Sequence, residues 1–443
     1  MPHHYFPHTK ADIDAMLERC GVKAVDELYA DVPAHLRMQK AYSLPEPQSE
    51  PEIRSYFNRL ARDNRQLVCF AGAGYYNHFT PSIIRHITER SEFLTAYTPY
   101  QPEISQGTLQ YIFEYQSMMT ELTGMEVSNA SMYDGTTATA EAIMMAVAAS
   151  RKRNRVLVSS TLSPAVREVV DTYALYHNIT VDTIPAYNGS TDIAALEKML
   201  AASDVAAVLL AQPNFYGIVE DWTGVAEKCK SAKSLLIVNS VASDLGMLRT
   251  PGEWGADIAC GDAQSLGMPL NFGGPYLGYI CTTKALIRKL PGRIVGATTD
   301  TEGRRTFVLT LQAREQHIRR DKATSNICSN QGLMALHTAI YLSALGPVGL
   351  RDVCEQSYAG AHELAAMLQA TGRMHLTYPQ APFFNEFLMT ADFDIDKLIA
   401  RGVAQGMLPG VKVDSHSILI AVTELNTPAQ CRDYVKLVND MPR

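Results

Sequence analysis

The run Ala206-Ala207-Val208-Leu209-Leu210-Ala211 consists of six apolar residues and is followed by Pro213 and Asn214. A short apolar run that ends at turn-forming residues predicts a buried β-strand. Four more candidate strands lie on either side of it in the chain: Val156–Ser159, Ile179–Ile184, Leu235–Asn239 and Ile258–Cys260. Helix-length segments with start signals, such as Pro164–Tyr176 and Asp192–Ala202, separate them. This alternation predicts an α/β protein with a mostly parallel sheet and helices on both of its faces.

The segments outside this region predict two further parts of the chain. Residues 1–65 contain two helix candidates, Ala11–Cys20 and Pro51–Asp63, joined by a proline-punctuated stretch, and are expected to form an arm. Residues 66–325 are expected to form the large domain, and residues 326–443 a smaller α+β domain. The elements expected near and after the end of the large domain are an adjoining strand Gly278–Thr283, a helix Gln331–Leu345, strands Phe384–Met389 and Ser417–Val422, and a final helix Pro428–Asn439.

Composition limits the classes of partner. The 443 residues include 39 basic and 46 acidic ones, for a formal charge of −7, without long runs of either sign. This balance argues against a nucleic-acid or membrane-surface partner. The eight cysteines include no C-x-x-C pair and the twelve histidines show no metal-binding spacing, so neither a disulfide framework nor a metal site is expected. The amino terminus does not have the pattern of a secretion signal, and a cytoplasmic protein is expected.

The stretch Gly261-Asp262-Ala263-Gln264-Ser265-Leu266-Gly267-Met268-Pro269 follows the last candidate strand and runs on to a Gly-Gly-Pro turn. In enzymes of the aminotransferase type, the corresponding loop carries the lysine that binds pyridoxal 5'-phosphate (PLP) as an imine. This chain has no lysine between Ser234 and Thr283. In the same enzymes the strand equivalent to Leu235–Asn239 ends in an aspartate that keeps the PLP ring nitrogen protonated. Here that position is Asn239, so both attachments are missing together.

The segment Tyr133-Asp134-Gly135-Thr136-Thr137 precedes an alanine-rich helix candidate, Ala138–Ser150. The free amides at a helix start suit a phosphate, and Gly135 and Thr136 are candidates for a phosphate pocket. The alternative is that Asp134 or Thr136 caps the helix. A similar choice applies to the loop after the central strand, where Asn214 and Gly217 either line a pocket or make a turn.

Two loops are rich in glycine, tyrosine and amide side chains, residues 72–78 and residues 97–107. Loops of this composition are expected outside the core, in a pocket or at an interface between subunits, because tyrosine combines an apolar ring with a polar tip. Packing between arm and body is the alternative. The charged stretch of residues 314–322 is expected to be a solvated helix face, with a docking surface as the alternative.

Taken in order, several segments resemble the glycine decarboxylase P-protein family of the glycine cleavage system, in its amino-terminal-half form from organisms that divide the enzyme into two chains. The matching segments are Pro7-His8-Thr9, Gly74-Tyr75-Tyr76-Asn77, Tyr97 to Gly107, Tyr133-Asp134-Gly135, Gln212-Pro213-Asn214-Phe215, Gly261 to Gly278, Arg314-Glu315-Gln316-His317-Ile318-Arg319-Arg320, Ala323-Thr324-Ser325-Asn326-Ile327 and Ala421-Val422-Thr423-Glu424. The resemblance implies a PLP-dependent transferase fold of the aspartate aminotransferase-like type, fold type I. It also implies a homologous second subunit that keeps the lysine and binds PLP, in a heterodimer or a heterotetramer of two plus two.

In that family, glycine is decarboxylated and its aminomethyl group passes to the lipoyl arm of the H-protein. The resemblance places the lost lysine at Gln264. It also implies that Tyr97, Tyr100, Gln101, Ser105 and Gln106 contact the partner's active site in trans. One alternative is a structural or regulatory pseudoenzyme subunit of the same complex. Another is an independent PLP enzyme that uses a lysine elsewhere, such as Lys284, although Thr283-Lys284-Ala285-Leu286 has the pattern of a solvated helix start.

Overall fold

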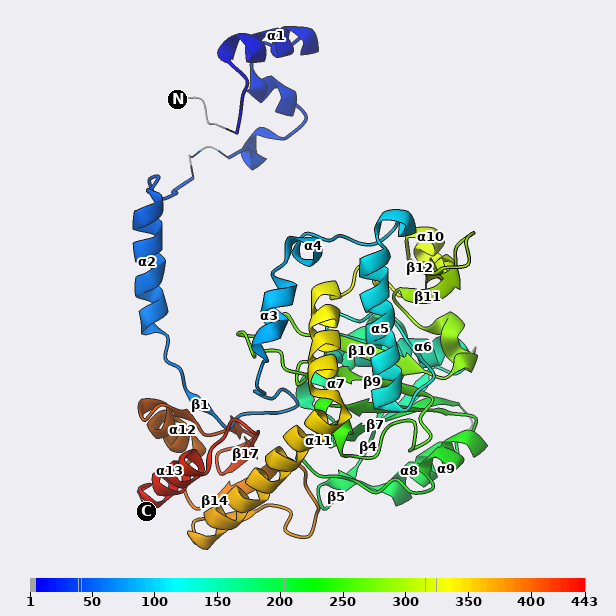
Figure 1. Cartoon of the computed structure of the whole chain (residues 1–443), viewed down its shortest axis with the longest axis vertical. Helices are drawn as coiled ribbons and strands as arrows, with labels where there is room; N and C mark the ends of the chain where they lie inside the picture. Colours follow the sequence, from blue (N-terminus) through cyan, green and yellow to red (C-terminus); the bar gives the residue numbers. More distant parts are fainter. Residues whose placement is uncertain are drawn as a thin grey trace. The chain divides into compact units, whose positions relative to one another are not determined.

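The computed structural model describes residues 5–38, 40, 42–150, 152–202, 204–314, 316–323 and 325–442. The chain divides into two compact units, residues 1–65 and residues 66–443 (Figure 1). The second unit contains both the parallel sheet and the carboxy-terminal sheet. The division of that unit into domains at residues 325 and 326 stays a prediction.

The first unit contains two capped helices. Helix α1 (Lys10–Cys20) begins at Thr9, whose backbone N–H donates to Asp12 Oδ2 at 2.7 Å in a capping box. It ends at Gly21, whose φ of 73° is left-handed. Helix α2 (Glu50–Asp63) begins with a second capping box, formed by Ser49 and Glu52. Both helices were predicted, and two 3-10 turns, η1 (Val25–Tyr29) and η2 (Ala34–Leu36), separate them.

A seven-stranded sheet forms the centre of the second unit (Figure 1). Its strands, in spatial order, are β2 (Val127–Ser128), β10 (Gly278–Thr282), β9 (Ile258–Asp262), β8 (Leu235–Ser240), β7 (Val205–Gln212), β3 (Arg155–Ser159) and β4 (Thr180–Ile184). The run from β9 to β4 is parallel, whereas β10 is antiparallel to both of its neighbours. The predicted parallel sheet and its adjoining strand are therefore confirmed.

Alternate residues of the central strand β7 belong to two different cores. Val208 and Leu210 pack in the cluster that includes residues of α5 (Gln106–Thr123), α8 (Ile193–Leu200), α9 (Val225–Ser231) and α11 (Gly332–Ala370). Ala207 and Leu209 pack in the cluster that includes residues of α6 (Gly135–Ser150) and α7 (Pro164–Tyr176). Successive side chains of a strand point to opposite faces, so helices cover both faces of the sheet, as predicted.

The carboxy-terminal part of the unit contains a four-stranded antiparallel sheet with the order β13-β14-β17-β16. Its elements are β13 (Met374–Leu376), β14 (Glu386–Ala391), α12 (Ile395–Ala404), β16 (Val411–Lys412), β17 (Ser417–Ala421) and α13 (Pro428–Asn439). Helix α11 leads into it and is longer than the predicted Gln331–Leu345, because a second helical segment continues after a kink at Gly346 and Pro347. Helix α11 is long and apolar enough to span a membrane, but many of its residues pack in the protein core. Length and composition are therefore weak evidence for a membrane span here.

Shorter elements complete the second unit. Strand β1 (Val68–Cys69) pairs in parallel with β15 (Met407–Leu408), more than 300 residues away in the sequence. Two antiparallel pairs were not predicted: β5 (Ala186–Tyr187) with β6 (Ser190–Thr191), and β11 (Ile294–Thr299) with β12 (Arg305–Thr310). The remaining short helices and turns are α3 (Ser82–Thr88), α4 (Ser91–Leu94), η3 (Pro102–Ile104), η4 (Ser243–Gly246), η5 (Lys284–Lys289), η6 (Gln312–Arg314), α10 (Gln316–Arg319) and η7 (Arg320–Lys322).

Candidate functional site

Gln264 lies fully buried in the loop that follows β9. Its side-chain amide is held by three hydrogen bonds. Oε1 accepts from the backbone N–H of Tyr76 at 2.9 Å, and Nε2 donates to the carbonyls of Tyr76 and Met268 at 2.9 and 2.6 Å. The residue expected at the lysine position therefore serves as a structural link between two loops, and it offers no amine to a cofactor.

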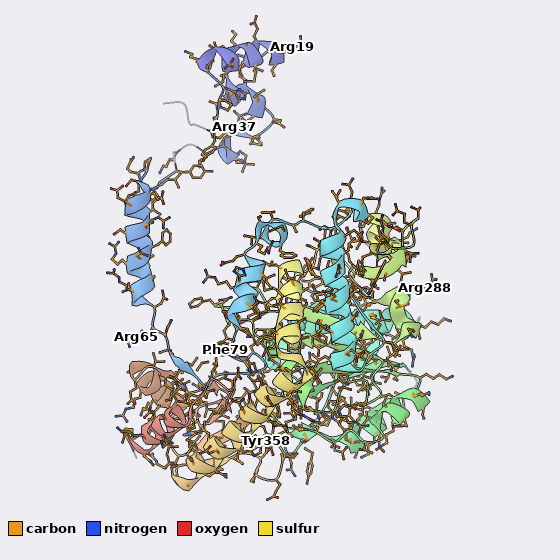
Figure 2. All side chains as sticks on the ribbon, in the orientation of Figure 1. Arg19, Arg37, Arg65, Phe79, Arg288 and Tyr358 are labelled. Atoms are coloured by element: carbon orange, nitrogen blue, oxygen red, sulfur yellow. The ribbon has the colours of Figure 1, made fainter. Side chains whose placement is uncertain are left out.

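The predicted loop of residues 72–78, which continues to Phe79, is more buried than its composition predicted. Tyr76 and His78 are only 3% and 4% exposed, so the expectation that this loop lies outside the core is wrong for these two residues. Phe79, labelled in Figure 2, is exposed at the end of the same loop. The misleading signal was the local composition, because burial here depends on partners that are far away in the sequence.

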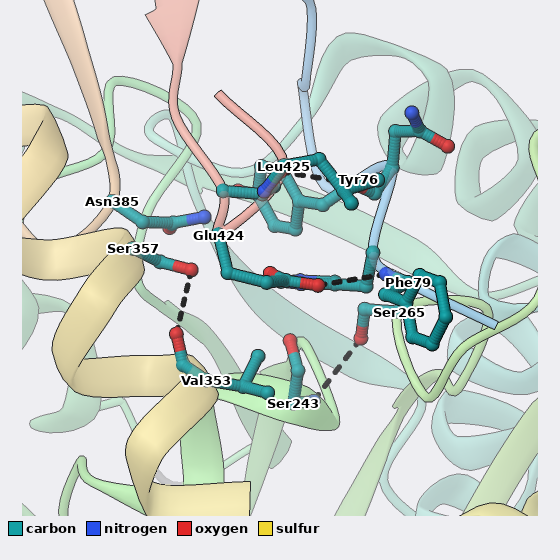
Figure 3. A network of polar contacts seen from close by, with 12 residues as sticks. Tyr76, Phe79, Ser243, Ser265, Val353, Ser357, Asn385, Glu424 and Leu425 are labelled. Carbon is teal, nitrogen blue, oxygen red and sulfur yellow. Dashed lines mark hydrogen bonds and ion pairs between the residues drawn. The ribbon is translucent and has the colours of Figure 1, made fainter. Parts of the chain in front are cut away.

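Those partners belong to the carboxy-terminal region and form a buried polar network with this loop, and Figure 3 shows the part of it in which Glu424 binds Phe79. Glu386 of β14 accepts from the Ala73 backbone N–H at 2.6 Å and from the Tyr76 hydroxyl at 2.9 Å. Glu424 lies 2.7 Å from His78 Nδ1 and accepts from the Phe79 backbone N–H at 2.7 Å. The network thus fixes the loop that in turn holds Gln264.

A third carboxyl, Asp244 in η4, lies buried near this network. Burial raises the pKa of Asp244 to about 7, while the Ser243 hydroxyl and the charge of His78 lower it. Burial likewise raises the pKa of Glu386 to about 7. Oδ2 of Asp244 and Nε2 of His78 have no hydrogen-bond partner among the described residues. Asp244 and Glu386 therefore keep a proton to a higher pH in the folded protein than exposed carboxyl groups do.

Asn239, at the end of β8, donates from Nδ2 to the Thr139 hydroxyl at 2.8 Å. Thr139 in turn donates to the carbonyl of Gly135 at 2.7 Å in helix α6. The amide of Asn239 is thus engaged with α6. A neutral amide also lacks the negative charge that keeps a pyridine nitrogen protonated.

Helix α6 begins at Gly135, three residues earlier than predicted, and its first amides already have partners. Asp134 Oδ1 accepts from the N–H groups of Thr136 and Thr137, both at 2.9 Å, so Asp134 caps the helix. The N–H of Gly135 donates to Asp262 Oδ2 at 2.8 Å. A phosphate at Gly135 and Thr136 would meet two carboxylates, so this geometry favours the cap over the predicted phosphate pocket.

The loop after β7 makes a turn. Asn214 Oδ1 accepts from the N–H groups of Tyr216 and Ile218 at 2.9 and 3.2 Å, and its Nδ2 donates to Glu220 Oε1 at 2.7 Å. The φ of Gly217 is 81°. Of the two alternatives for this loop, these bonds support the turn.

The loop of residues 97–107 carries exposed side chains. Tyr97 is 82% exposed and Tyr100 51% exposed, and Gln101 is also exposed, whereas Ser105 is half-buried. The Tyr100 hydroxyl accepts from Arg293 Nη2 at 3.2 Å, and the guanidinium of Arg293 is 5.4 Å from the centre of the tyrosine ring. The loop therefore presents Tyr100 with its hydroxyl group fixed.

Gln106 differs from the other candidates in this loop. Its Oε1 accepts from the Thr306 hydroxyl and the Phe307 N–H at 2.7 and 2.9 Å, and its Nε2 donates to the Phe307 carbonyl at 2.9 Å. These bonds tie the start of α5 to β12. The contact of Gln106 with a partner stays a prediction, and the hydrogen bonds show that its amide is already used within this chain.

Arg293 and Asp262 are two residues of this region that were not singled out from the sequence as candidates. Arg293 is 4% exposed and donates to the carbonyl of Cys328 at 2.6 Å as well as to Tyr100. A single arginine after Pro291 and Gly292 gives no local signal of this role. In the charged stretch of residues 314–322, Ile318 is exposed, and the centre of the His317 ring lies 6.4 Å from the centre of the Tyr100 ring. Glu315 and Thr324 lie outside the described residues.

The residues present do not fit covalently bound PLP. Gln264 supplies no amine, Asn239 supplies no charge, and Asp262 occupies the helix start. A cavity of about 540 Å³ lies between residues 188–190, 218–221 and 377–382, and none of these three residues lines it. Within the described residues, no cluster of three or more His, Cys, Asp or Glu side chains is arranged to hold a metal ion.

The mostly parallel seven-stranded sheet, its two layers of helices and the carboxy-terminal antiparallel sheet define the class of PLP-dependent transferases of fold type I, here in a form without the imine-forming lysine. A sphingosine-1-phosphate lyase from Burkholderia pseudomallei has the same fold, with a TM-score of 0.68 over 92% of this chain and 94% of that one at 14% identity.

Within this class, the chain belongs to the glycine cleavage system P-protein family, whose model matches residues 3–438. It is 46% identical over 99% of both chains to the probable glycine dehydrogenase (decarboxylating) subunit 1 of Bacillus pumilus. It is also similar to a crystal structure of glycine decarboxylase (P-protein) of the glycine cleavage system in inhibitor-bound form. That match has a TM-score of 0.90 and 41% identity, over 99% of this chain and 100% of the other.

Proposed function

We propose that this chain is subunit 1 of glycine dehydrogenase (decarboxylating), the P-protein of the glycine cleavage system. A second, homologous subunit carries PLP, which serves as the electron sink when glycine loses its carboxylate. The aminomethyl group then passes to the lipoyl arm of the H-protein. The observation that carries this proposal is the buried Gln264 at the expected lysine position in a chain that matches subunit 1 relatives over nearly its full length.

The assembly in this proposal is a pair of unlike subunits, alone or duplicated about a two-fold axis. Co-expression of this chain with a lysine-bearing P-protein subunit, followed by mass measurement of the purified complex, tests it. Equal amounts of both chains and glycine decarboxylation that requires both support the proposal. Decarboxylation of glycine by this chain alone contradicts it.

Four side chains of the loop of residues 97–107 are proposed to reach the partner's active site: Tyr97, Tyr100, Gln101 and Ser105. Tyr100 has the most support, because it is half exposed and its hydroxyl group is fixed by Arg293. A tyrosine held in this way binds or orients a neighbouring polar group and excludes water with its ring. These are the contributions that we assign to this chain, while the covalent chemistry belongs to the partner.

The reconstituted pair gives the test of this role. We expect Tyr100→Ala and Ser105→Ala to lower glycine decarboxylation while the complex stays assembled. Tyr176→Ala is the matched control, since Tyr176 is 78% exposed but ends helix α7. Helix α7 runs back from the carboxyl end of β3 to the start of the parallel strand β4. Tyr176 therefore lies near the amino-terminal ends of the parallel strands, whereas ligands in this kind of sheet bind at the carboxyl ends. Unchanged turnover in both loop variants supports the alternative, a structural or regulatory pseudoenzyme subunit.

The other alternative is an independent PLP enzyme that uses Lys284. Lys284 begins the 3-10 turn η5, and its side chain is 77% exposed, with Nζ 3.6 Å from Glu126 Oε1. Arg288 of the same turn is also exposed (Figure 2). An exposed amine beside a carboxylate lacks the enclosed apolar pocket that activates a lysine for imine formation. An absorbance spectrum of the isolated chain with PLP, before and after borohydride, tests this alternative, which requires a reducible imine band.

A further inference from the structure

Two aspartates close the start of helix α6 from different parts of the chain. Asp134, directly before the helix, binds the N–H groups of Thr136 and Thr137. Asp262, at the end of β9 and 127 residues later in the sequence, binds the N–H of Gly135 at 2.8 Å. The other oxygen of Asp262, Oδ1, accepts from the N–H of Gln264 at 2.8 Å. The Asp262 carboxylate thus binds one backbone N–H of helix α6 and one of the loop that carries the lysine in related enzymes.

The start of helix α6 packs closely against the residues around Asp262. A Cβ atom built on Gly135 would lie 2.8 Å from both the Cβ and the backbone nitrogen of Asp262, so only glycine fits at this point of the helix. A Cβ built on Gly278 of β10 would lie 2.2 Å from the carbonyl oxygen of Asp134. The helix start is therefore pressed against the ends of β9 and β10. A phosphate at the N–H of Gly135 would have to displace the Asp262 carboxylate, which already accepts from that N–H.

Two stacked tyrosines lie close to these carboxylates. The ring centres of Tyr75 and Tyr276 are 4.8 Å apart, and the ring planes are inclined by 26°. Burial raises the pKa of Tyr75, and the negative charges of Asp262 and Asp134 raise it further. Burial and the charge of Asp262 likewise raise the pKa of Tyr276. Asp262 itself is only 7% exposed, and burial raises its pKa to about 7, while the backbone N–H groups of Gly135, Gln264 and Leu277 lower it. The carboxylates and the helix start are consequently shielded from bulk water.

We infer that Asp262 is a built-in anion whose carboxylate takes the place of a cofactor phosphate at the start of helix α6 and closes this chain's own cofactor site. The amides and dipole at a helix start favour a negative group, whether it belongs to a ligand or to the protein. In this chain the negative group is the side chain of Asp262. Its two carboxylate oxygens accept hydrogen bonds from Gly135 of helix α6 and from Gln264 of the following loop. The chain therefore completes its fold with no ligand bound at this helix.

Chemical rescue tests this inference on the full-length chain. Asp262→Ala removes the carboxylate, and we expect the midpoint of thermal unfolding to fall by about 2–6 °C, because buried amides lose their acceptor. Formate, which has the size of the lost group, and inorganic phosphate are then added against chloride at equal ionic strength. We expect at least one of them to restore the midpoint of the variant with saturation, and neither to shift the midpoint of the wild-type chain.

Asp244→Ala is the matched control, since Asp244 is also buried but accepts from Ser243 and not from helix α6. We expect this variant to lose stability without rescue by either anion. Stabilisation of the wild-type chain by phosphate overturns the inference, and so does an Asp262→Ala variant that folds and responds to neither anion. If Asp262→Ala yields no folded protein, Asp262→Asn is the second variant. Asparagine keeps the shape of the side chain and one hydrogen-bond acceptor but has no charge. A thermal unfolding midpoint equal to that of the wild-type chain would therefore overturn the inference that Asp262 acts as a built-in anion.

The inference goes beyond the proposed function and is independent of it. It concerns amides and a carboxylate of this chain alone, whereas the proposed function depends on glycine turnover by two subunits. A complex that fails to decarboxylate glycine leaves the rescue result unaffected. Equally, phosphate binding to the wild-type chain would overturn the role of Asp262 and leave the partner subunit's chemistry intact.

Discussion

The side chain of Gln264 pairs with the backbone of Tyr76 through two hydrogen bonds of 2.9 Å, one in each direction. An amide is the side chain suited to this task, since it carries both a donor and an acceptor. Lysine has donors only and is strongly disfavoured in a fully buried place without an acidic partner. Replacing Gln264 by lysine would therefore break these hydrogen bonds and bury an unpaired charge, and would not simply restore a cofactor-binding amine.

Gln264→Lys is expected to destabilise the chain and to form no imine with PLP. The N–H of Tyr76 would lose its acceptor, at a cost of about 1–3 kcal/mol, and the buried ammonium would add to this cost. Urea unfolding measures the loss, and borohydride reduction followed by mass spectrometry detects an imine. Gln264→Met is the control, because it removes the same hydrogen bonds without burying a charge. A stable Gln264→Lys chain labelled at residue 264 would show that the site is still able to hold the cofactor.

Arg293 is expected to act on turnover through Tyr100. Arg293→Lys keeps the charge but loses the planar group that contacts the Tyr100 hydroxyl and the Cys328 carbonyl. We expect turnover of the reconstituted complex to fall by about tenfold, the equivalent of one charge-assisted hydrogen bond of about 1.4 kcal/mol.

A double-mutant cycle separates this coupling from a general loss of stability. Tyr100→Phe removes the hydroxyl alone, and if Arg293 works by positioning that hydroxyl, the two substitutions together lower turnover no more than the stronger one alone. Thermal midpoints of each variant report the structural cost. Fully additive effects on turnover would mean that Arg293 acts independently of Tyr100.

The buried carboxyls of the polar network predict a dependence of stability on pH. The pKa of Asp244 is raised by burial to about 7 in the folded protein, against 3.8 as its ordinary value. Between about pH 4 and pH 7 the folded chain therefore binds a proton that the unfolded chain has lost. The contribution of Asp244 is then favourable at low pH and is lost as pH rises through this window, with a slope of at most about 1.4 kcal/mol per pH unit.

Asp244→Asn isolates this contribution, because it presents a neutral group at every pH. We expect the stability difference between variant and wild type to shift in favour of the variant as the pH rises from 4 to 7, measured by urea unfolding at several pH values. Glu386 stays in place and keeps its own dependence, since burial raises its pKa to about 7 as well. Asp221→Asn, at an exposed carboxyl whose pKa the Thr223 hydroxyl lowers, is the control. A difference that does not change with pH would show that Asp244 is ionised in the folded chain.

The sequence predicted those parts of the fold whose cause is local. Val208 and Leu210 belong to an apolar run that is buried on both faces of the sheet, and the start of helix α7 followed from Ser163 and Pro164. The carboxyl-end loops were harder. Tyr76 is buried by contacts with Gln264 and Glu386, which lie 188 and 310 residues away, and no local pattern encodes such contacts.

The candidate site shows the same division. The missing lysine and the neutral Asn239 are visible in the sequence as residue types at expected places. The engagement of Gln106 with Phe307 and the arrival of Asp262 at helix α6 depend on how distant segments pack. The hairpin of β11 and β12 was missed because its apolar residues form two short runs, Ile294–Val295 and Phe307–Leu309, without the alternation that predicts a strand.

Gly217 is expected to tolerate no side chain, because a Cβ atom there would clash with β14. Gly224 serves as the comparison that separates this clash from backbone strain. Gly217 and Gly224 have nearly the same left-handed φ, 81° and 83°. A Cβ on Gly217 would lie 2.0 Å from the carbonyl oxygen of Glu386 in β14, whereas a Cβ on Gly224 would meet nothing within 4 Å. Gly224→Ala therefore measures the backbone strain alone, about 1–2 kcal/mol.

Gly217→Ala adds to that strain the displacement of β14, and we expect it to cost about 1–3 kcal/mol more than Gly224→Ala in urea unfolding. Because Glu386 also holds Ala73 and Tyr76, displacing this strand should loosen the loop of residues 72–79 as well. Hydrogen exchange at the amides of Ala73 and Tyr76 is the direct measurement, with faster exchange expected in Gly217→Ala and not in Gly224→Ala. Equal stability losses and unchanged exchange in the two variants would show that β14 and the loop after β7 do not approach as closely as this packing requires.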